Sequence, residues 1–434
     1  MTMLDGVRQA ALRVGARRRL RAVLQSCRRL LSERGEANSS VVARELLAGY
    51  ARLDETTRRL FFLHLATDFN PDPQAVLAAA RAYAAAPSAA TLAPLIEAAE
   101  PPRQELLRRL NRVGGGTAHI VAMRRVLLAE LRAQPELAAV EADFLHLLSS
   151  WFNPGFLQLR RVDWNSPAQL LEQLIRHEAV HAIDGWDDLR RRLQPDRRCF
   201  AFFHPQLPDE PLIFVEVALL PEMPAAIAPL IAKHDKPASS ERFKVAAFYS
   251  ISNCQPGLKG VNLGNFLIKR VAGELGRELP HLEIFCTLSP IPALVRWLRA
   301  GAEIPGLGGT RAQQLLTARA ALQAHVGADW ALPESAAALR RMPPEAFDAL
   351  QRLAAMFLAW ATPTAVGDPV ARFHLENGAR LERLNAWGDL SAKGLKQSCG
   401  LMVNYLYDLR RIERHHERFV DGEVAYLRAI AAML

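Results

Sequence analysis

The segment FKVAAFYSISNCQPGLKGVNLGNFLIKRVAGELGREL, residues 243–279, combines a β-rich run, a loop with several glycines and a helical pattern. The apolar run 243–252 is typical of a strand, and the residues after Gly264 follow a helical period. A loop between a strand and a helix presents free backbone N–H groups at the helix N-terminus, where the helix dipole also favours anions. The segment therefore predicts a site for a phosphate group, with an ordinary glycine turn as the alternative.

The regions on either side of this segment indicate the fold class. Further β-rich runs occupy 198–204, 211–219 and 282–289, whereas residues 1–150 show helical periodicity throughout. We predict an N-terminal all-helical bundle domain, 1–150, followed by a mixed-sheet α/β domain, 151–434. The second domain carries a helical insertion at about 305–360.

A different motif lies before the first β-rich run. His177, Glu178 and His181 form H-E-x-x-H, which on a helix places two imidazoles on one face, as in zinc metalloproteases. We expect this helix over 167–182. Two features oppose a zinc hydrolase: the predicted strands follow the motif instead of preceding it, and position 184 is Asp, not the Gly of the extended motif.

A zinc site would also need a third ligand, for which Glu210 and Glu216 are the candidates. Glu216 lies within a strongly apolar run that reads as a buried strand. The sequence therefore favours a structural role, in which His177 and His181 lie on a helix between domains and Trp186 anchors the end of that helix. A zinc hydrolase remains a distant alternative.

The composition narrows the kinds of partner. The net charge of +9 comes almost entirely from arginine, which favours an anionic partner but also reflects base composition. No basic patch interleaved with aromatic residues is present, and no apolar run reaches 18 residues, so we expect neither a nucleic acid nor a membrane as partner. The five cysteines contain no C-x-x-C pair, which indicates reduced thiols.

The two ends of the sequence carry few features of targeting signals. The Arg-rich amphipathic segment 7–31 resembles a mitochondrial presequence, but it continues into further helical pattern and reads as a surface helix. The C-terminal AAML carries no S-K-L peroxisomal address. We therefore expect a cytoplasmic, bacterial-like protein.

The strand, loop and helix of 243–279 resemble the GNAT superfamily of acetyl-CoA-binding N-acetyltransferases, in which such a loop holds the CoA pyrophosphate. Five longer segments, in order, resemble the malonyl-CoA decarboxylase family. They are WFNPGFLQLRRVDWNSPAQLLEQLIRHEAVHAIDGWDDLRRRL, VNLGNFLIKRV, EIFCTLSPIPALVRWL, FHLENGARLERLNAWGD and CGLMVNYLYDL. This likeness spans about residues 150–410, and it implies a GNAT-like catalytic domain in which the A-V-H segment is helical and binds no zinc.

The resemblance also implies an activity and a site. The reaction would convert malonyl-CoA to acetyl-CoA and CO2 without metal or other cofactor, because the thioester itself accepts the electron pair. The catalytic residues would be Ser289, His374 and Tyr407, with His374 as proton donor and Ser289 bonded to the carboxylate or the thioester. The substrate-binding segment would be Lys259, Gly260, Val261, Asn262, Leu263, Gly264 and Asn265, where Asn262 replaces an expected acidic residue.

The sequence leaves two other functional classes open. A GNAT-fold acyltransferase would use the same loop but would require an acceptor amine, and a non-catalytic protein would bind malonyl-CoA without turnover. The helical domain would mediate assembly into a homodimer or homotetramer.

Overall fold

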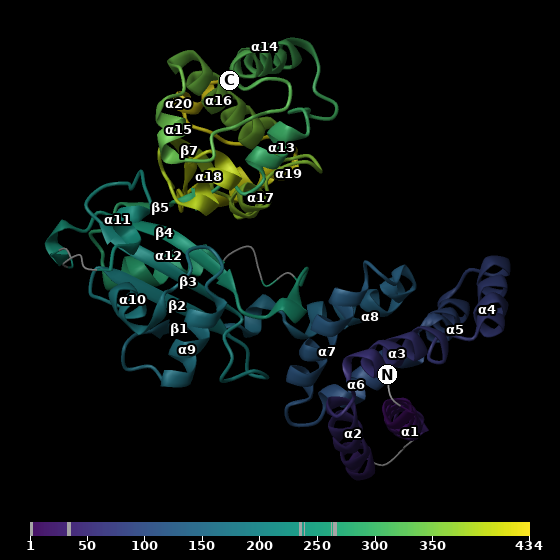
Figure 1. Cartoon of the computed structure of the whole chain (residues 1–434). Helices are drawn as coiled ribbons and strands as arrows, with labels where there is room; N and C mark the ends of the chain where they lie inside the picture. Colours follow the sequence, from purple (N-terminus) through teal and green to yellow (C-terminus); the bar gives the residue numbers. More distant parts are fainter. Residues whose placement is uncertain (1–2, 33–35, 234–236, 238, 262, 264–266) are drawn as a thin grey trace. The chain divides into compact units, whose positions relative to one another are not determined.

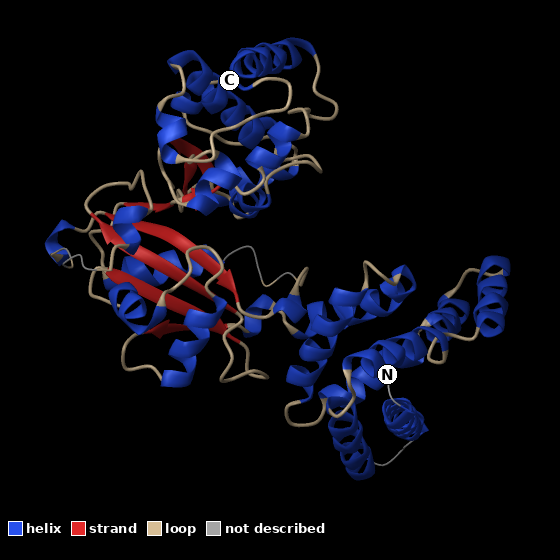
Figure 2. Cartoon of the chain, in the orientation of Figure 1, coloured by secondary structure: helices blue, strands red, loops and turns tan. Residues whose placement is uncertain are grey.

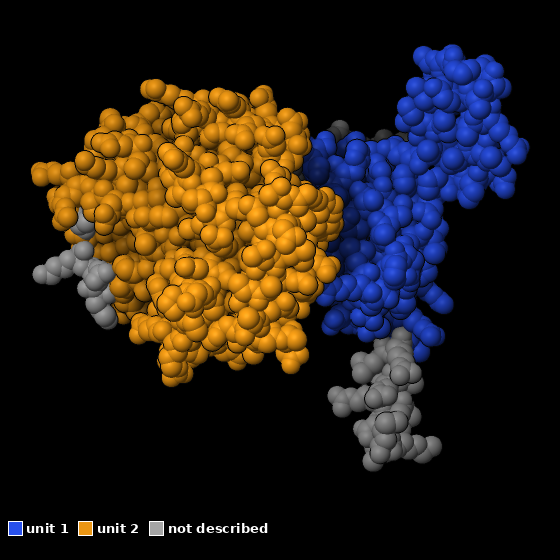
Figure 3. Space-filling view, turned by 90° about the horizontal axis from the view of Figure 1, so that it is seen from above, with its two compact units in different colours: residues 1–158, 204–210, 255–263 blue, residues 159–203, 211–254, 264–434 orange. Residues whose placement is uncertain are grey.

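The computed structural model describes every residue except 1–2, 33–35, 234–236, 238, 262 and 264–266 (Figure 1). The chain folds into two compact units (Figure 3). The first comprises Met1–Gln158, His204–Glu210 and Gln255–Leu263, and the second comprises Leu159–Phe203, Pro211–Cys254 and Gly264–Leu434. Two short loops from the sheet region therefore fold with the helices of the first unit.

The first unit is helical, as predicted (Figure 2). Its α-helices are α1 (Met3–Ser32), α2 (Glu36–Ala51), α3 (Glu55–Thr67), α4 (Pro73–Ala85), α5 (Ala89–Ala99), α6 (Pro102–Asn111), α7 (Gly116–Glu130) and α8 (Ala138–Trp151). Side-chain caps start several of them: Asp54 accepts the N–H of Thr57, and Ser88 forms a capping box with Thr91. The fully buried rings of Phe61, Phe62 and Phe144 meet edge to face at the centre of the unit.

The second unit is built on a mixed sheet. Its strands are β1 (Gln158–Val162), β2 (Arg197–Phe203), β3 (Ile213–Leu220), β4 (Val245–Asn253), β5 (Ile284–Thr287), β6 (Ser289–Pro290), β7 (Arg380–Asn385) and β8 (Met402–Leu406). Across the described residues the order is β1-β2-β3-β4-β5-β8-β6, with β7 also paired to β8. Strands β2, β3 and β4 are antiparallel, and β5 runs parallel to β4. This is a mixed sheet, as the sequence predicts.

Helices cover both faces of the sheet. Alternate residues of a strand point to opposite faces, and the central strands are apolar on both, so each face needs a cover. On one face, Leu171 of α9 (Ala168–His177) and Leu189 of α10 (Gly185–Arg192) share a core with Phe203 of β2. On the other face, the guanidinium of Arg270 in α12 (Leu267–Glu278) lies over the ring of Phe202. Helix α12 connects β4 to β5, as expected for the crossover between parallel strands.

The remaining α-helices lie between the strands or after the last strand in the sequence. They are α11 (Ala228–Ile231), α13 (Leu294–Arg299), α14 (Gly309–Val326), α15 (Ala336–Arg340), α16 (Pro344–Met356), α17 (Pro369–Glu376), α18 (Ala392–Ser398), α19 (Ile412–Val420) and α20 (Arg428–Ala431). Helices α14–α16 and a π-helical turn, Phe357–Ala361, occupy the predicted helical insertion. No helix in the described part of the chain is long and apolar enough to cross a membrane, and all five cysteines are free and buried.

The predicted helix over 167–182 is wrong in its second half. Helix α9 ends at His177, and Glu178 has extended backbone angles. The Glu178 carboxylate accepts the N–H groups of Val180 and His181, which in a longer helix would donate to carbonyls four residues earlier. The side chain therefore replaces the helical hydrogen bonds and ends the helix.

Three strands were not predicted. Strand β1 precedes α9, so the expectation that every strand follows the H-E-x-x-H motif is wrong. Strands β7 and β8 lie in the C-terminal region that had no assigned strand. Two of these strands lack a clear apolar alternation in the sequence. Strand β1 is mostly exposed, and a register shift between Leu381 and Arg383 interrupts the alternation of β7.

Candidate active site

The site forms where three segments of the second unit meet. Ser289 begins β6, directly after β5. His374 lies on α17, whose start is fixed by Asp368, because this carboxylate accepts the N–H groups of Val370 and Ala371. Tyr407 follows β8, and its N–H donates to the carbonyl of Phe285 in β5. The pairing of β8 with β5, β6 and β7 therefore brings the three predicted catalytic residues together.

A glycine turn returns the chain from α17 to the sheet. Gly378 has a φ of +77°, and a Cβ there would lie 2.3 Å from the carbonyl oxygen of Ile412. Only glycine combines this backbone angle with such close approach. The turn lets β7 begin two residues later, beside β8, and so keeps His374 close to Tyr407.

Hydrogen bonds connect the three side chains. The Oγ of Ser289 lies 3.1 Å from Nε2 of His374, and Nδ1 of His374 lies 2.8 Å from the hydroxyl of Tyr407. Ser289 donates its proton to Oγ1 of Thr287 at 2.9 Å. Its oxygen therefore accepts from Nε2–H of His374, and the Tyr407 hydroxyl donates to Nδ1. The imidazole is held at both nitrogens in one tautomer.

Burial sets the protonation states of this group. His374 is 4 % exposed, and burial lowers the pKa of its imidazole to about 3. Burial also raises the pKa of Tyr407 well above its ordinary value. At neutral pH both side chains are therefore uncharged in the empty site. The imidazole ring also stacks on Tyr405, with 4.8 Å between ring centroids.

A cavity of about 320 Å³ opens beside Ser289 and His374. Most of its lining is apolar, including Ile213, Phe248 and Phe373. Polar groups reach it at a few points only, which is typical of sites that orient a small reacting group. An apolar wall strengthens the electrostatic effect of each polar group, because little water competes for it.

Thr287 and Tyr405 were not recognised as site residues from the sequence. Their spacing from Ser289 and Tyr407 is a signal that could have identified them, because residues two apart in a strand share one face. Thr287 precedes Ser289 by two residues, and Tyr405 precedes Tyr407 by two. In the structure each pair does contribute to the same side-chain cluster.

The predicted substrate-binding loop belongs partly to the first unit. Lys259, Gly260, Val261 and Leu263 fold with that unit, whereas Asn262, Gly264 and Asn265 lie outside the described residues. The N–H groups of Lys259 and Val261 donate to carbonyls of their own turn. These two backbone groups are therefore already paired and do not form an open anion cradle.

Close packing explains the conformation of this loop. A Cβ on Gly257 would lie 2.0 Å from the carbonyl oxygen of Val121, so glycine lets the loop pack directly on α7. The buried guanidinium of Arg124 donates to the carbonyls of Gly257 and Lys259, each at 2.7 Å. The glycine at 257 therefore serves packing within the first unit.

The H-E-x-x-H motif forms part of the cavity wall. Glu178 is buried and accepts hydrogen bonds from Ser250 at 2.7 and 2.8 Å and from Ser252 at 3.2 Å. The backbone N–H of Val180 donates to the same carboxylate at 2.8 Å. Val180 and Ser250 both line the cavity. The motif thus joins the end of α9 to β4.

The zinc alternative finds no support in the positions of its ligands. His177 ends α9 and His181 lies beyond it, so they do not share one helical face. Glu216 is paired with Arg192 at 3.0 Å inside the core. Among the described residues, no group of three or more His, Cys, Asp or Glu side chains is placed to hold a metal ion.

We expect Glu178→Ala to lower the free energy of unfolding by about 2–4 kcal/mol, because it leaves several buried donors without an acceptor. Urea denaturation of the variant and the wild type measures this difference. Glu172→Ala, an exposed position on the same helix, is the matched control and should change stability by less than about 0.5 kcal/mol. Equal stability of the two variants would contradict the anchoring role of Glu178.

Comparison with known proteins identifies the family of this fold and site. The family model for the malonyl-CoA decarboxylase C-terminal domain matches residues 155–434, and that for the N-terminal domain matches residues 69–152. The chain belongs to the malonyl-CoA decarboxylase family.

Individual relatives agree with this assignment. The chain is 36 % identical over 330 residues to a protein of Anser anser anser named mitochondrial malonyl-CoA decarboxylase, covering 71 % of this chain and 64 % of the relative. The corresponding Rattus norvegicus protein is 37 % identical over 325 residues, covering 70 % of this chain and 65 % of the relative. The chain thus spans just under two thirds of the length of these curated relatives.

Solved structures match over nearly the whole chain. A crystal structure of malonyl-CoA decarboxylase from Rhodopseudomonas palustris has a TM-score of 0.85 at 46 % identity, covering 95 % of this chain and 99 % of that chain. The structure from Agrobacterium vitis has a TM-score of 0.83 at 44 % identity, with the same coverage of 95 % and 99 %.

Proposed function

We propose that this protein is a carboxy-lyase that converts malonyl-CoA and a proton to acetyl-CoA and CO2. The observation that carries the proposal is the hydrogen-bonded set of Ser289, His374 and Tyr407 beside a mostly apolar cavity. Family membership supports the same reaction, since curated relatives are named malonyl-CoA decarboxylase.

In the proposed mechanism the carbon–carbon bond to the carboxylate breaks and CO2 leaves. The electron pair moves into the thioester, which becomes an enolate. Ser289 turns its hydroxyl toward the substrate and donates a hydrogen bond to the thioester oxygen or the departing carboxylate. Such preorganised donors lower the barrier because they face the charge that develops in the transition state.

The proton for the new carbon–hydrogen bond comes from His374. Its pKa is low in the empty cavity because burial disfavours the imidazolium. The malonyl carboxylate brings a negative charge next to the ring, which favours the imidazolium, so the substrate and one proton bind together. Tyr407 accommodates both states, because its hydroxyl can donate to Nδ1 or accept from Nδ1–H. After proton transfer to carbon, His374 is neutral again.

This scheme requires no metal or organic cofactor, because the thioester carbonyl itself accepts the electron pair. A homodimer or homotetramer and a cytoplasmic location stay predictions from the sequence.

The first test is acetyl-CoA formation from malonyl-CoA by the purified protein, with and without EDTA. We expect turnover without any acceptor amine and equal rates in both conditions. Turnover only in the presence of an amine would instead favour an acyltransferase, and binding without turnover would favour a non-catalytic protein. Activity lost in EDTA and restored by zinc would contradict the metal-free mechanism.

A further inference from the structure

The side chain of Asp368 joins two segments that carry candidate catalytic residues. It is fully buried. One carboxylate oxygen, Oδ1, accepts the N–H groups of Val370 and Ala371 at 2.9 and 3.0 Å, at the start of α17. The other oxygen, Oδ2, accepts the N–H of Ala293 at 2.9 Å, directly before α13. A single carboxylate therefore connects two segments that lie 75 residues apart in the sequence.

The connection from Asp368 to Ser289 is short and stiff. Ser289 and Ala293 are separated by three residues, two of which are prolines with a fixed φ. Strand β6 contains only Ser289 and Pro290, and a proline has no N–H to donate to the sheet. Pairing with β8 therefore supplies few hydrogen bonds at this point, and the anchor at Ala293 helps to hold Ser289 in place.

The connection from Asp368 to His374 runs through α17. Asp368 is the N-cap of this helix, and Pro369 follows at its start, where the fixed φ of proline suits a helix. His374 comes six residues after the cap, which is less than two helical turns. Any shift of the helix start therefore moves the imidazole.

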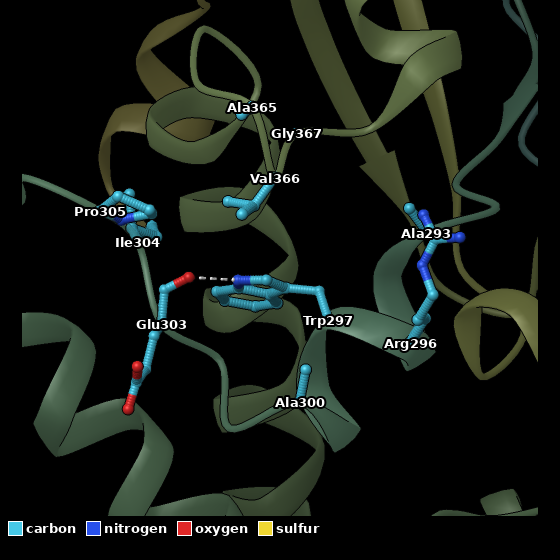
Figure 4. A pocket seen from close by; sticks show the side chains of 10 residues that line it. All are labelled: Ala293, Arg296, Trp297, Ala300, Glu303, Ile304, Pro305, Ala365, Val366 and Gly367. Atoms are coloured by element: carbon cyan, nitrogen blue, oxygen red, sulfur yellow. Dashed lines mark hydrogen bonds between the residues drawn. The ribbon is translucent and has the colours of Figure 1, made fainter. Parts of the chain in front are cut away.

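A second cavity lies beside these two connections (Figure 4). Its volume is about 650 Å³, and both Ala293 and Gly367, the residue before Asp368, line it. The cavity leaves room into which the two segments could shift if their shared carboxylate were lost. Their spacing therefore depends on the hydrogen bonds of Asp368 and is only partly secured by surrounding side chains.

A carboxylate at this position is costly, which indicates what it contributes. Burial raises the pKa of Asp368, while its backbone hydrogen bonds and the charge of Arg296 oppose this effect. An uncharged Ser or Asn would cap α17 about as well without the cost of burying a charge. The carboxylate differs from these caps because both of its oxygens are acceptors, so it can cap the helix and hold Ala293 at once.

We propose that Asp368 is a positioning residue that sets the distance between Oγ of Ser289 and Nε2 of His374. These atoms lie 3.1 Å apart. The hydrogen bonds of Asp368 described above go to backbone N–H groups, so it acts through the placement of the two side chains. A misplacement of about 1 Å can cost about 10²-fold in rate. The catalytic consequence rests on the proposed function.

The test begins with Asp368→Asn, which preserves size but leaves one acceptor oxygen in place of two. That oxygen can serve the helix cap or Ala293, but not both. We expect kcat for malonyl-CoA to fall about 10–100-fold, with KM changed by less than about twofold. Asp368→Ser should behave alike, because its hydroxyl can cap α17 but is too short to reach Ala293 as well. A thermal melt shows that each variant is folded.

The matched control is Asp54→Asn, at the N-cap of α3 in the first unit. Asp54 accepts the N–H of Thr57 at 2.8 Å, so the control changes a helix cap in the same way at another place. It should leave kcat unchanged. Wild-type kcat in both Asp368 variants would overturn the proposal.

A combination with Ser289→Ala separates positioning from a general loss of structure. Without the Ser289 hydroxyl, the distance that Asp368 sets no longer matters. Adding Asp368→Asn to Ser289→Ala should therefore lower kcat by less than about threefold further. Losses that multiply would indicate general structural damage and would contradict the positioning role.

Crystal structures separate this inference from the proposed function. If the wild type does not decarboxylate malonyl-CoA, the proposed reaction fails, and the distance between Oγ of Ser289 and Nε2 of His374 still tests the role of Asp368. We expect 3.1 Å in the wild type and more than about 3.5 Å, beyond hydrogen-bond range, in Asp368→Asn. An unchanged distance in the variant would refute the positioning role.

Discussion

We expect His374→Ala to lower kcat for malonyl-CoA decarboxylation by about 10²–10⁴-fold, the usual contribution of a positioned proton donor. This loss is expected because both ring nitrogens of His374 are held in place by neighbouring side chains beside the cavity. No other imidazole among the described residues lines the cavity to replace it. Steady-state assays of acetyl-CoA formation measure the loss. KM should change little, because most of a CoA thioester lies away from the imidazole.

The matched control is His325→Gln, an exposed histidine of α14, which should retain full activity. A His374→Ala enzyme with wild-type kcat would remove His374 from the mechanism. Full restoration of that variant by added imidazole would instead support direct proton transfer.

The same variant tests the buried neutral state of the imidazole through the pH dependence of stability. The pKa of His374 is about 3 in the folded protein, against an ordinary value near 6.5. The unfolded chain therefore binds a proton below pH 6.5 that the folded protein does not bind. Stability is fully present above pH 6.5 and falls as pH decreases from 6.5 toward 3.

The His374→Ala variant has no imidazole at this position and therefore lacks this contribution to the pH dependence of stability. Between pH 6 and 4, the wild type should lose about 1.4 kcal/mol of unfolding free energy per pH unit more than the variant. Burial also lowers the pKa of His181, to about 4, but that contribution is common to both proteins and cancels. Parallel stability curves from urea denaturation would contradict a neutral, buried His374.

We expect Ser289→Ala to lower kcat by about 10²–10³-fold, the range found when one donor to a developing oxyanion is removed. The variant loses the hydroxyl that accepts from Nε2–H of His374, so the imidazole also loses one of its two anchors. Acetyl-CoA formation under saturating malonyl-CoA measures the effect. The control is Ser150→Ala, at an exposed position of α8, which should leave kcat unchanged.

The double variant Ser289→Ala/His374→Ala distinguishes a joint role from independent roles. Groups that act as a unit show strongly non-additive effects, so the double variant should be only slightly slower than the slower single variant. Losses that multiply would indicate that Ser289 and His374 act in separate steps, contrary to their hydrogen bond in the structure.

The sequence predicted the local elements that have a clear pattern. The segment 243–279 folds as β4 and α12 because its apolar residues follow a strand period and then a helical period. The same reasoning failed at Glu178, where the spacing of two histidines suggested a continuing helix. Spacing alone does not reveal that a side chain will take the N–H groups on which the helix depends.

The candidate catalytic residues were named from resemblance, and their convergence required the folded chain. Ser289, His374 and Tyr407 are separated by long stretches of sequence, and they meet because β8 pairs with β5, β6 and β7. Strands β7 and β8 had not been recognised. Pairing between distant strands depends on the whole sheet, so a local period does not predict it.

Apolar periodicity and long motifs are local properties of the chain, and they were enough to predict the helical first part, the mixed-sheet second part and the family resemblance. Three features required the folded structure: the burial of His374 between Ser289 and Tyr407, the hydrogen bonds of Glu178 to β4, and the cavity beside the candidate catalytic side chains. These features depend on burial and on distances between remote residues, which arise only when the strands and helices pack.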